Sequence, residues 1–158
     1  MQHRESDIQA AIVRYFRYAI QPKFRDAQLI VNPLADTYFG KEGARIMQQA
    51  ARRGFEKGLP DILIIQQTIT PAPDEDLLFS EGYPYELHFM SFAGIALELK
   101  SDNANVYKQN GELIANEHVQ RQARVLEKLR SNYIIAEFAQ GFDEAMAYLS
   151  WYFDMNTY

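Results

Sequence analysis

Apolar residues recur at helical spacing in several stretches of the chain, and each stretch predicts an amphipathic helix. The first stretch contains Ile8, Ile12 and Phe16, and its helix has to end before Pro22 because proline cannot continue a helix. The predicted helix that begins at Asn116 starts with a residue whose side chain caps helix N-termini well. The four predicted helices cover residues 6–19, 44–53, 116–129 and 143–153.

Apolar runs without a helical period predict strands. The clearest run follows Asp61 and is continuous, which is typical of a strand that is buried on both faces. Asn110 and Gly111 form a favoured two-residue turn and predict a small hairpin within residues 105–114. The predicted strands cover residues 29–31, 61–65, 85–89, 94–100 and 133–138. This order of elements predicts an α/β fold in which a central mixed β-sheet is flanked by α-helices.

The composition favours one soluble domain. The chain has 158 residues, 47% of them apolar, so we expect a single domain over residues 1–158 with its own core. It has no cysteine, which excludes disulfides and thiolate metal sites. It also lacks an apolar run of membrane-spanning length and an apolar N-terminal secretory segment. We therefore expect no membrane partner and a cytoplasmic, intracellular location.

The net charge of −5 comes from 16 Lys and Arg residues against 21 Asp and Glu residues, and alone it argues against a nucleic-acid partner. Five of the acids, however, lie in the turn-rich residues 71–86, which belong to a predicted acidic surface insertion at about 67–86. Without these five acids, the 16 basic residues of the chain are matched by 16 acidic ones. The basic residues gather in residues 4–25, 41–57 and 121–130, although solvated helix faces would show the same clusters.

Three charged residues stand at the ends of predicted strands. Asp61 begins one strand, while Glu98 and Lys100 are two positions apart near the end of another and therefore project from the same face. Two carboxylates and the Leu99 backbone carbonyl are suitable ligands for a hard divalent cation. On spacing alone, an exposed Glu98–Lys100 ion pair beside an ordinary turn residue is the simpler explanation.

The order of the motifs resembles the PD-(D/E)xK nuclease superfamily, and most closely its virus-type replication-repair nuclease (VRR-NUC) branch. The element Gly58-Leu59-Pro60-Asp61 is followed by Glu98-Leu99-Lys100, as in that branch. Glu5 and Gln9 match its N-terminal E-x-x-x-Q pattern, and Gln120 matches the glutamine of its later helix. The resemblance covers about residues 5–153 and implies a restriction-endonuclease-like core. The acidic insertion departs from the small members of the branch.

The resemblance also implies a role for each matching residue. Asp61, Glu98, the Leu99 carbonyl and Glu5 would bind Mg²⁺ or Mn²⁺, Lys100 would be the catalytic lysine, and Gln120 would support the edge of the site. Basic residues near these motifs are candidate DNA contacts. They form two groups, Arg45, Arg52, Arg53 and Lys57 in the first and Arg121, Arg124 and Lys128 in the second.

The resulting hypothesis is a metal-dependent DNA endonuclease, bacterial or phage-encoded, that hydrolyses phosphodiester bonds. Stand-alone members of the branch resemble homodimeric Holliday-junction resolvases, which implies DNA repair, branched or duplex DNA and a homodimer. Two alternatives remain: a restriction-type or single-strand nuclease on the same fold, and a non-catalytic acidic protein-binding module. Residues 40–43 lack the end of a phosphate-binding loop, so we expect no nucleotide cofactor. The three histidines lack zinc-site spacing.

Overall fold

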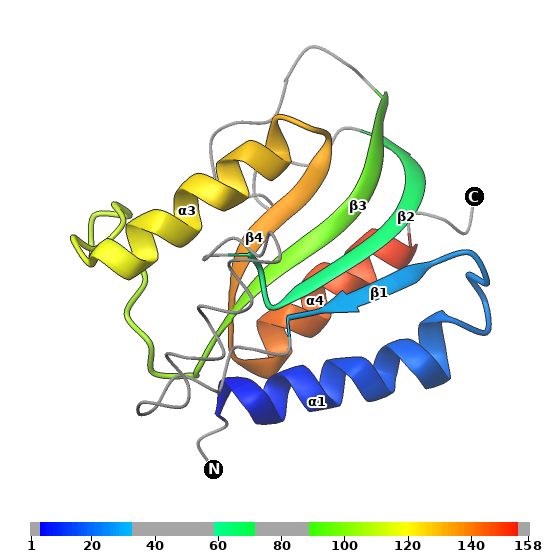
Figure 1. Cartoon of the computed structure of the whole chain (residues 1–158), viewed down its shortest axis with the longest axis horizontal. Helices are drawn as coiled ribbons and strands as arrows, with labels where there is room; N and C mark the ends of the chain where they lie inside the picture. Colours follow the sequence, from blue (N-terminus) through cyan, green and yellow to red (C-terminus); the bar gives the residue numbers. More distant parts are fainter. Residues whose placement is uncertain (1–3, 33–58, 72–88, 155–158) are drawn as a thin grey trace, which may run out of the picture.

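The computed structural model describes residues 4–32, 59–71 and 89–154 (Figure 1). Their strands form one four-stranded sheet in the order β1-β2-β3-β4. The strands are β1 (Gln28–Val31), β2 (Ile62–Pro71), β3 (Phe89–Lys100) and β4 (Ile134–Gln140). β2 pairs antiparallel with both β1 and β3, whereas β3 and β4 are parallel. The predicted mixed sheet is therefore confirmed.

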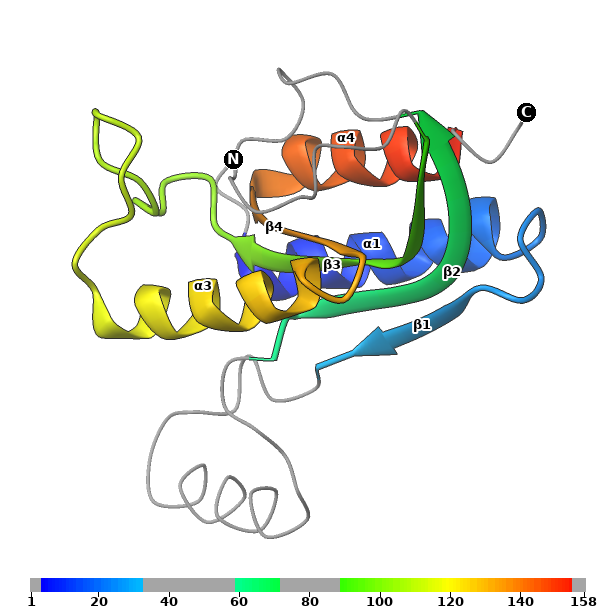
Figure 2. The ribbon, with the colours of Figure 1, turned by 90° about the horizontal axis from the view of Figure 1, so that it is seen from above.

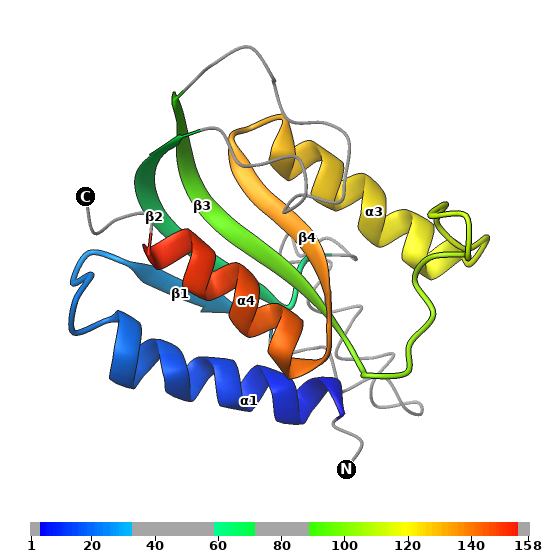
Figure 3. The same cartoon turned by 180° about the vertical axis from the view of Figure 1, so that it is seen from behind.

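Helices cover both faces of this sheet, as Figure 2 shows. α1 (Glu5–Tyr15) and α4 (Gly141–Asp154) lie on one face, and α3 (Glu117–Arg130) lies on the other (Figures 2 and 3). The parallel β3–β4 connection runs through α3, as a parallel crossover requires. Three of the four predicted helices, at residues 6–19, 116–129 and 143–153, are confirmed.

Alternation along β3 divides the core into two clusters. Leu97 and Leu99 face α1 and α4, together with Ile12 and Tyr152. Ala96 faces α3, in a smaller cluster with buried apolar residues of that helix and of β4. Successive side chains of a strand point to opposite faces. Glu98 and Lys100 must therefore point to the α3 side of the sheet, which is where the candidate site forms.

The first helix has an unusual end. α1 passes without a break into a π-helical turn, η1 (Phe16–Ile20), in which the N–H of Gln21 donates to the carbonyl of Phe16 at 2.8 Å. Both segments end before Pro22, in agreement with the sequence. The final helix begins at Gly141, two residues earlier than predicted. Gly141 has a φ of +79°, which L side chains rarely adopt, so glycine suits this junction between β4 and the helix.

The two central strands are longer than predicted. β2 continues past Ile65 to Pro71, and β3 begins at Phe89 and runs through the predicted break before Gly94. The strands extend because they pair with each other over almost their whole length, with a register shift between Ile65 and Thr68. Long antiparallel pairing provides hydrogen-bond partners for the backbone N–H and C=O groups of both strands. A short apolar run in the sequence does not show how far such pairing extends.

Two further predictions concern loops. The hairpin is present as a bridge between Tyr107 and Leu113, but Lys108 and Glu112 flank a three-residue loop rather than a two-residue turn. Gly111 has a φ of +82° and is the third residue of this loop, which is a common alternative hairpin geometry. The helix predicted at 44–53 lies outside the described residues. Residues 67–71 of the predicted insertion belong to β2, and its remainder also lies outside them.

Candidate functional site

The pairing of β2 with β3 brings together charged residues that are far apart in the sequence. Ile62 pairs with Leu97, so Asp61, just before β2, lies beside the end of β3. Its Oδ2 accepts a hydrogen bond of 2.9 Å from the backbone N–H of Leu99. The predicted trio of Asp61, Glu98 and Lys100 therefore meets at one end of the two central strands.

Glu98 lies at the centre of this group. Its Oε1 accepts a 2.9 Å hydrogen bond from Lys100 Nζ and a second one from Gln122 Nε2. Its Oε2 is buried and has no hydrogen-bond partner among the described residues. Asp61, Glu98, Lys100 and Gln122 are each no more than 7% exposed, so this is not the exposed ion pair that spacing alone allowed.

Burial raises the pKa values of both Asp61 and Glu98. Removal from water, with a smaller contribution from the nearby Asp61, raises the pKa of Glu98 to about 8, although Lys100 opposes the shift. Burial also raises the pKa of Asp61 to about 6, against the hydrogen bond from Leu99 and the charge of Lys100. Two buried carboxylates with raised pKa values and a single lysine beside them form an electrostatically strained group, a pattern that is enriched at functional sites.

The first helix contributes to the same end of the sheet. Glu5, its first residue, is half-buried, and its charge raises the pKa values of both Asp61 and Glu98. One turn later, Gln9 Nε2 donates at 3.2 Å to the carbonyls of Asn32 and Asp61. Gln9 thus ties α1 to the segment that carries Asp61. Both residues of the E-x-x-x-Q pattern lie at the site, although Gln9 contacts backbone rather than carboxylates.

The glutamine that touches Glu98 is Gln122, which sequence reasoning missed. The predicted Gln120 instead donates to the carbonyl of Ile114 at 2.9 Å and so supports the loop before α3. Val119, Gln122 and Leu126 are the buried face of α3. The signal for Gln122 was a polar residue at a helical spacing that otherwise holds core residues.

The rim of the site is formed by the start of α3. His118 is exposed, and burial of part of its ring, followed by the charges of Lys100 and Arg121, lowers its pKa. Of the predicted DNA contacts, Arg121 forms a 3.0 Å ion pair with Glu117, and Arg124 and Lys128 are exposed on the outer side of the helix. The predicted contacts Arg45, Arg52, Arg53 and Lys57 lie outside the described residues.

The donors at this site suit a hard divalent cation. The partnerless Oε2 of Glu98 and the carboxylate of Asp61 are oxygen ligands whose mutual repulsion a cation would remove. In the described part of the chain, no three His, Asp or Glu side chains are grouped closely enough to hold a metal by themselves. Glu5 therefore does not complete a three-carboxylate set. A cation here would need further oxygens from backbone, water or substrate, as Mg²⁺ commonly has.

Comparison with known proteins supports the resemblance at the level of the fold. The structure is similar to that of a "VRR_NUC domain protein", with a TM-score of 0.53 and 16% sequence identity, over 98% of this chain and 91% of that one. The sequence matches no protein-family model and no curated protein. The predicted restriction-endonuclease-like α/β fold, of the kind that VRR-NUC domains have, is confirmed. None of the described helices has the length and apolarity needed to cross a membrane.

Proposed function

We propose that this protein is a metal-dependent nuclease of the PD-(D/E)xK type that hydrolyses phosphodiester bonds in DNA. The observation that carries the proposal is the buried group of Asp61, Glu98 and Lys100, in which one Glu98 oxygen lacks any partner in the described structure. The fold shared with a VRR_NUC domain protein supports the same function, as does the meeting of the residues that resemble the VRR-NUC motif at one end of β2 and β3.

Each residue of the site has a role in the proposed reaction. Asp61 and Glu98 would hold Mg²⁺ or Mn²⁺, the Leu99 carbonyl would add a third oxygen, and Glu5 would be an accessory acid from α1. When bound, the cation supplies Lewis acidity and lowers the pKa of a water molecule. Lys100, held at 2.9 Å from Glu98, orients the attacking water and offsets the negative charge that develops on the phosphate. Gln122 holds Glu98 in place from α3.

The proposed substrate is duplex or branched DNA, cut by a homodimer. Arg124 and Lys128 are exposed on the outer side of the helix that carries Gln122, and they remain the proposed phosphate contacts on this helix. Contacts of this kind position DNA without reading its sequence, which suits a structure-selective enzyme. Because a four-way junction is cut symmetrically on two strands, its resolution needs two active sites, which a twofold dimer supplies.

A cleavage assay tests the proposal. The purified protein is incubated with supercoiled plasmid and with a synthetic four-way junction, in Mg²⁺, Mn²⁺ or EDTA. We expect cutting only with metal, and loss of cutting in the Lys100→Ala variant. Symmetric nicks restricted to the junction would support the resolvase form, and plasmid cutting would support a less selective nuclease. Absence of metal-dependent cutting in the wild type would overturn the proposal and favour the non-catalytic binding module.

Lys108→Ala is a matched control for Lys100→Ala. Lys108 also forms a lysine–glutamate ion pair, with Glu112 at 2.8 Å, but that pair is exposed and lies on the hairpin. Its removal takes away the same charge and should leave cutting unchanged. Equal loss in both variants would mean that net charge, rather than the position of Lys100, controls activity.

A further inference from the structure

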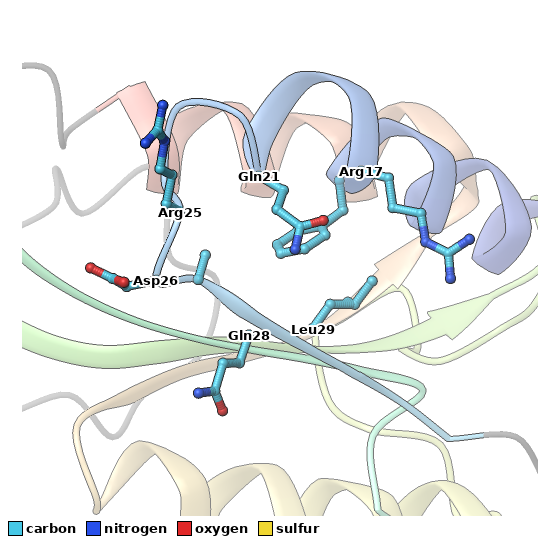
Figure 4. A pocket seen from close by; sticks show the side chains of 8 residues that line it. Arg17, Gln21, Arg25, Asp26, Gln28 and Leu29 are labelled. Carbon is cyan, nitrogen blue, oxygen red and sulfur yellow. The ribbon is translucent and has the colours of Figure 1, made fainter.

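A pocket of about 550 Å³ lies at the other end of the first helix, between η1 and β1 (Figure 4). Phe16 and Leu29 form an apolar floor, while Arg17, Gln21 and Arg25 supply its polar wall. In the view of Figure 4, Gln21 lies between the two arginines, and the carboxylate of Asp26 points to the edge of the pocket, away from Gln21. The proposed nuclease chemistry uses none of these residues.

The two arginines are available for a ligand. Both are exposed, and neither forms an ion pair within the described residues. A guanidinium presents several donors in a rigid planar fork that matches a phosphate group well. Gln21 adds an uncharged amide that can donate to the same oxygens. The chemistry of the pocket therefore favours an anion with several oxygen acceptors.

The backbone at the pocket is also unusual. Arg17 lies inside the π-helical turn, and Gln21 closes that turn through its N–H. Such turns are rare and occur frequently at functional sites, because they shift side chains relative to an ordinary helix. Here the turn carries Arg17 and is followed by Gln21, two exposed residues of the pocket, while its Phe16 and Ile20 are buried in the core.

The helix connects the pocket to the acidic pair. Glu5, whose charge acts on Asp61 and Glu98, begins α1, and Arg17 follows it by twelve positions along the continuous segment of α1 and η1. Figure 3 shows this segment running along the sheet. At about 1.5 Å per residue, this segment covers roughly 18 Å. That length equals about five steps of duplex DNA at about 3.4 Å each. One DNA strand could therefore contact both places.

We propose that this pocket binds two backbone phosphates of the DNA substrate, several nucleotides away from the bond that is cut. The inference rests on the proposed nuclease function and extends it by assigning a second contact region. Arg17 and Arg25, whose guanidinium groups point to opposite sides of Gln21 in Figure 4, each contact one phosphate, and Gln21 donates to a backbone oxygen between them. These contacts set how much DNA must flank the cut. An acidic protein segment is the competing occupant, and the experiment separates the two.

The experiment measures binding without cleavage. Fluorescence anisotropy in EDTA gives the Kd of a 24-base-pair duplex for the wild type and for Arg17→Ala/Arg25→Ala over a range of salt concentrations. We expect roughly tenfold weaker binding and a fall of about 2 in the slope of log K against log salt, as for two lost phosphate contacts. A duplex of about four base pairs is too short to reach the pocket and should show no difference.

The control is Arg14→Ala/Lys23→Ala, which removes the same charge from exposed residues that do not line the pocket. It should bind the long duplex within about twofold of the wild type. Equal weakening in both double variants would overturn the proposal, because net charge would then be the cause. A poly-glutamate peptide that binds the wild type but not the pocket variant, with DNA binding unchanged, would assign the pocket to an acidic protein segment instead.

Failure of the proposed function would look different. If no variant or wild type cuts DNA with metal, but the pocket variant alone weakens duplex binding, the nuclease proposal is wrong and the phosphate contact stands. If the protein cuts DNA and the pocket variant binds and cuts short and long duplexes like the wild type, the pocket proposal is wrong and the nuclease stands. The melting temperatures of both double variants show whether the fold is retained.

Discussion

The side-chain amide of Gln122 donates a hydrogen bond to Oε1 of Glu98. Lys100 Nζ contacts the same oxygen at 2.9 Å, so both donors converge on one side of the carboxylate. The other oxygen, Oε2, is left buried and without a partner among the described residues. This arrangement fixes the orientation of the carboxylate and presents one oxygen to the place where a cation would bind.

Replacing Gln122 by alanine should therefore impair the site without removing any charged group. Groups that orient metal ligands typically contribute about 10–100-fold in metal affinity or activity. We expect Gln122→Ala to lower single-turnover cleavage by that factor and to raise the Mn²⁺ concentration needed for half-maximal rate. Gln120→Ala is the matched control, because Gln120 contacts the carbonyl of Ile114 instead. A larger loss of cleavage in Gln120→Ala than in Gln122→Ala would support Gln120 as the glutamine of the site, as the sequence predicted.

Removing the charge of Glu98 should stabilise the metal-free protein. Burial and the neighbouring Asp61 disfavour the Glu98 carboxylate, whereas glutamine has nearly the same shape and no charge. We expect Glu98→Gln to raise the Tm in EDTA by roughly 3–6 °C and to abolish metal-dependent cutting. Differential scanning calorimetry gives the Tm. Glu112→Gln, at an exposed ion pair, should leave both properties unchanged. A lower Tm for Glu98→Gln would mean that the buried Glu98 carboxylate does not destabilise the metal-free protein.

Local patterns in the sequence predicted the α/β fold, whereas the group of strand-end acids was predicted from the order of motifs that resembles the VRR-NUC branch. Glu98 and Lys100 share a face by the two-residue period of a strand, and Asp61 meets them because neighbouring strands pair in the expected way. Gln122 was missed although its helical spacing places it on the same face as Val119 and Leu126, which pack against the sheet. The resemblance pointed to Gln120, which lies two positions away on the helix and contacts the carbonyl of Ile114 instead.

The sequence pattern also did not predict how far the two central strands extend. Phe89–Gly94 and Thr68–Pro71 become strand because each pairs with the other across the sheet. Such pairing is a long-range interaction, and strand propensity depends strongly on it. The pocket at Arg17 and Arg25 was hidden for a similar reason, because the cluster of basic residues at 4–25 does not reveal which of them face β1.

The two central strands approach each other closely at Gly94. A Cβ added at Gly94 would lie 2.4 Å from the carbonyl oxygen of Ile64 on β2. Because that atom belongs to the backbone, the strands would have to separate. We expect Gly94→Ala to lower the free energy of unfolding by about 1–3 kcal/mol, measured by urea denaturation.

Gly111→Ala provides the comparison for that variant. Gly111 has a φ of +82° but nothing lies within 4 Å of an added Cβ, so its cost comes from backbone strain alone, about 1 kcal/mol. It should leave the site intact. If Gly94→Ala were as stable as the wild type, β2 and β3 would be farther apart at this position than the structure has them.

The stability of the metal-free protein should decrease as the pH rises. In the unfolded chain, Asp61 and Glu98 have ordinary pKa values of about 3.9 and 4.3. In the folded protein, burial raises these pKa values to about 6 and about 8. Between about pH 4 and pH 8 the folded state therefore binds more protons than the unfolded state. The free energy of unfolding must fall over this window, and the contribution is fully present only below about pH 4.

A divalent cation should reverse this trend. Because it competes with protons for the same two carboxylates, Mn²⁺ should raise the Tm strongly at pH 8 and only slightly at pH 5.5. At 100 times its Kd, a bound ion stabilises the folded state by about 2.7 kcal/mol. Thermal unfolding at both pH values, with Mn²⁺ or EDTA, measures the effect. In Glu98→Gln the Mn²⁺ effect at pH 8 should disappear. An equal Mn²⁺ effect at both pH values, or one that survives in Glu98→Gln, would place the cation away from Asp61 and Glu98.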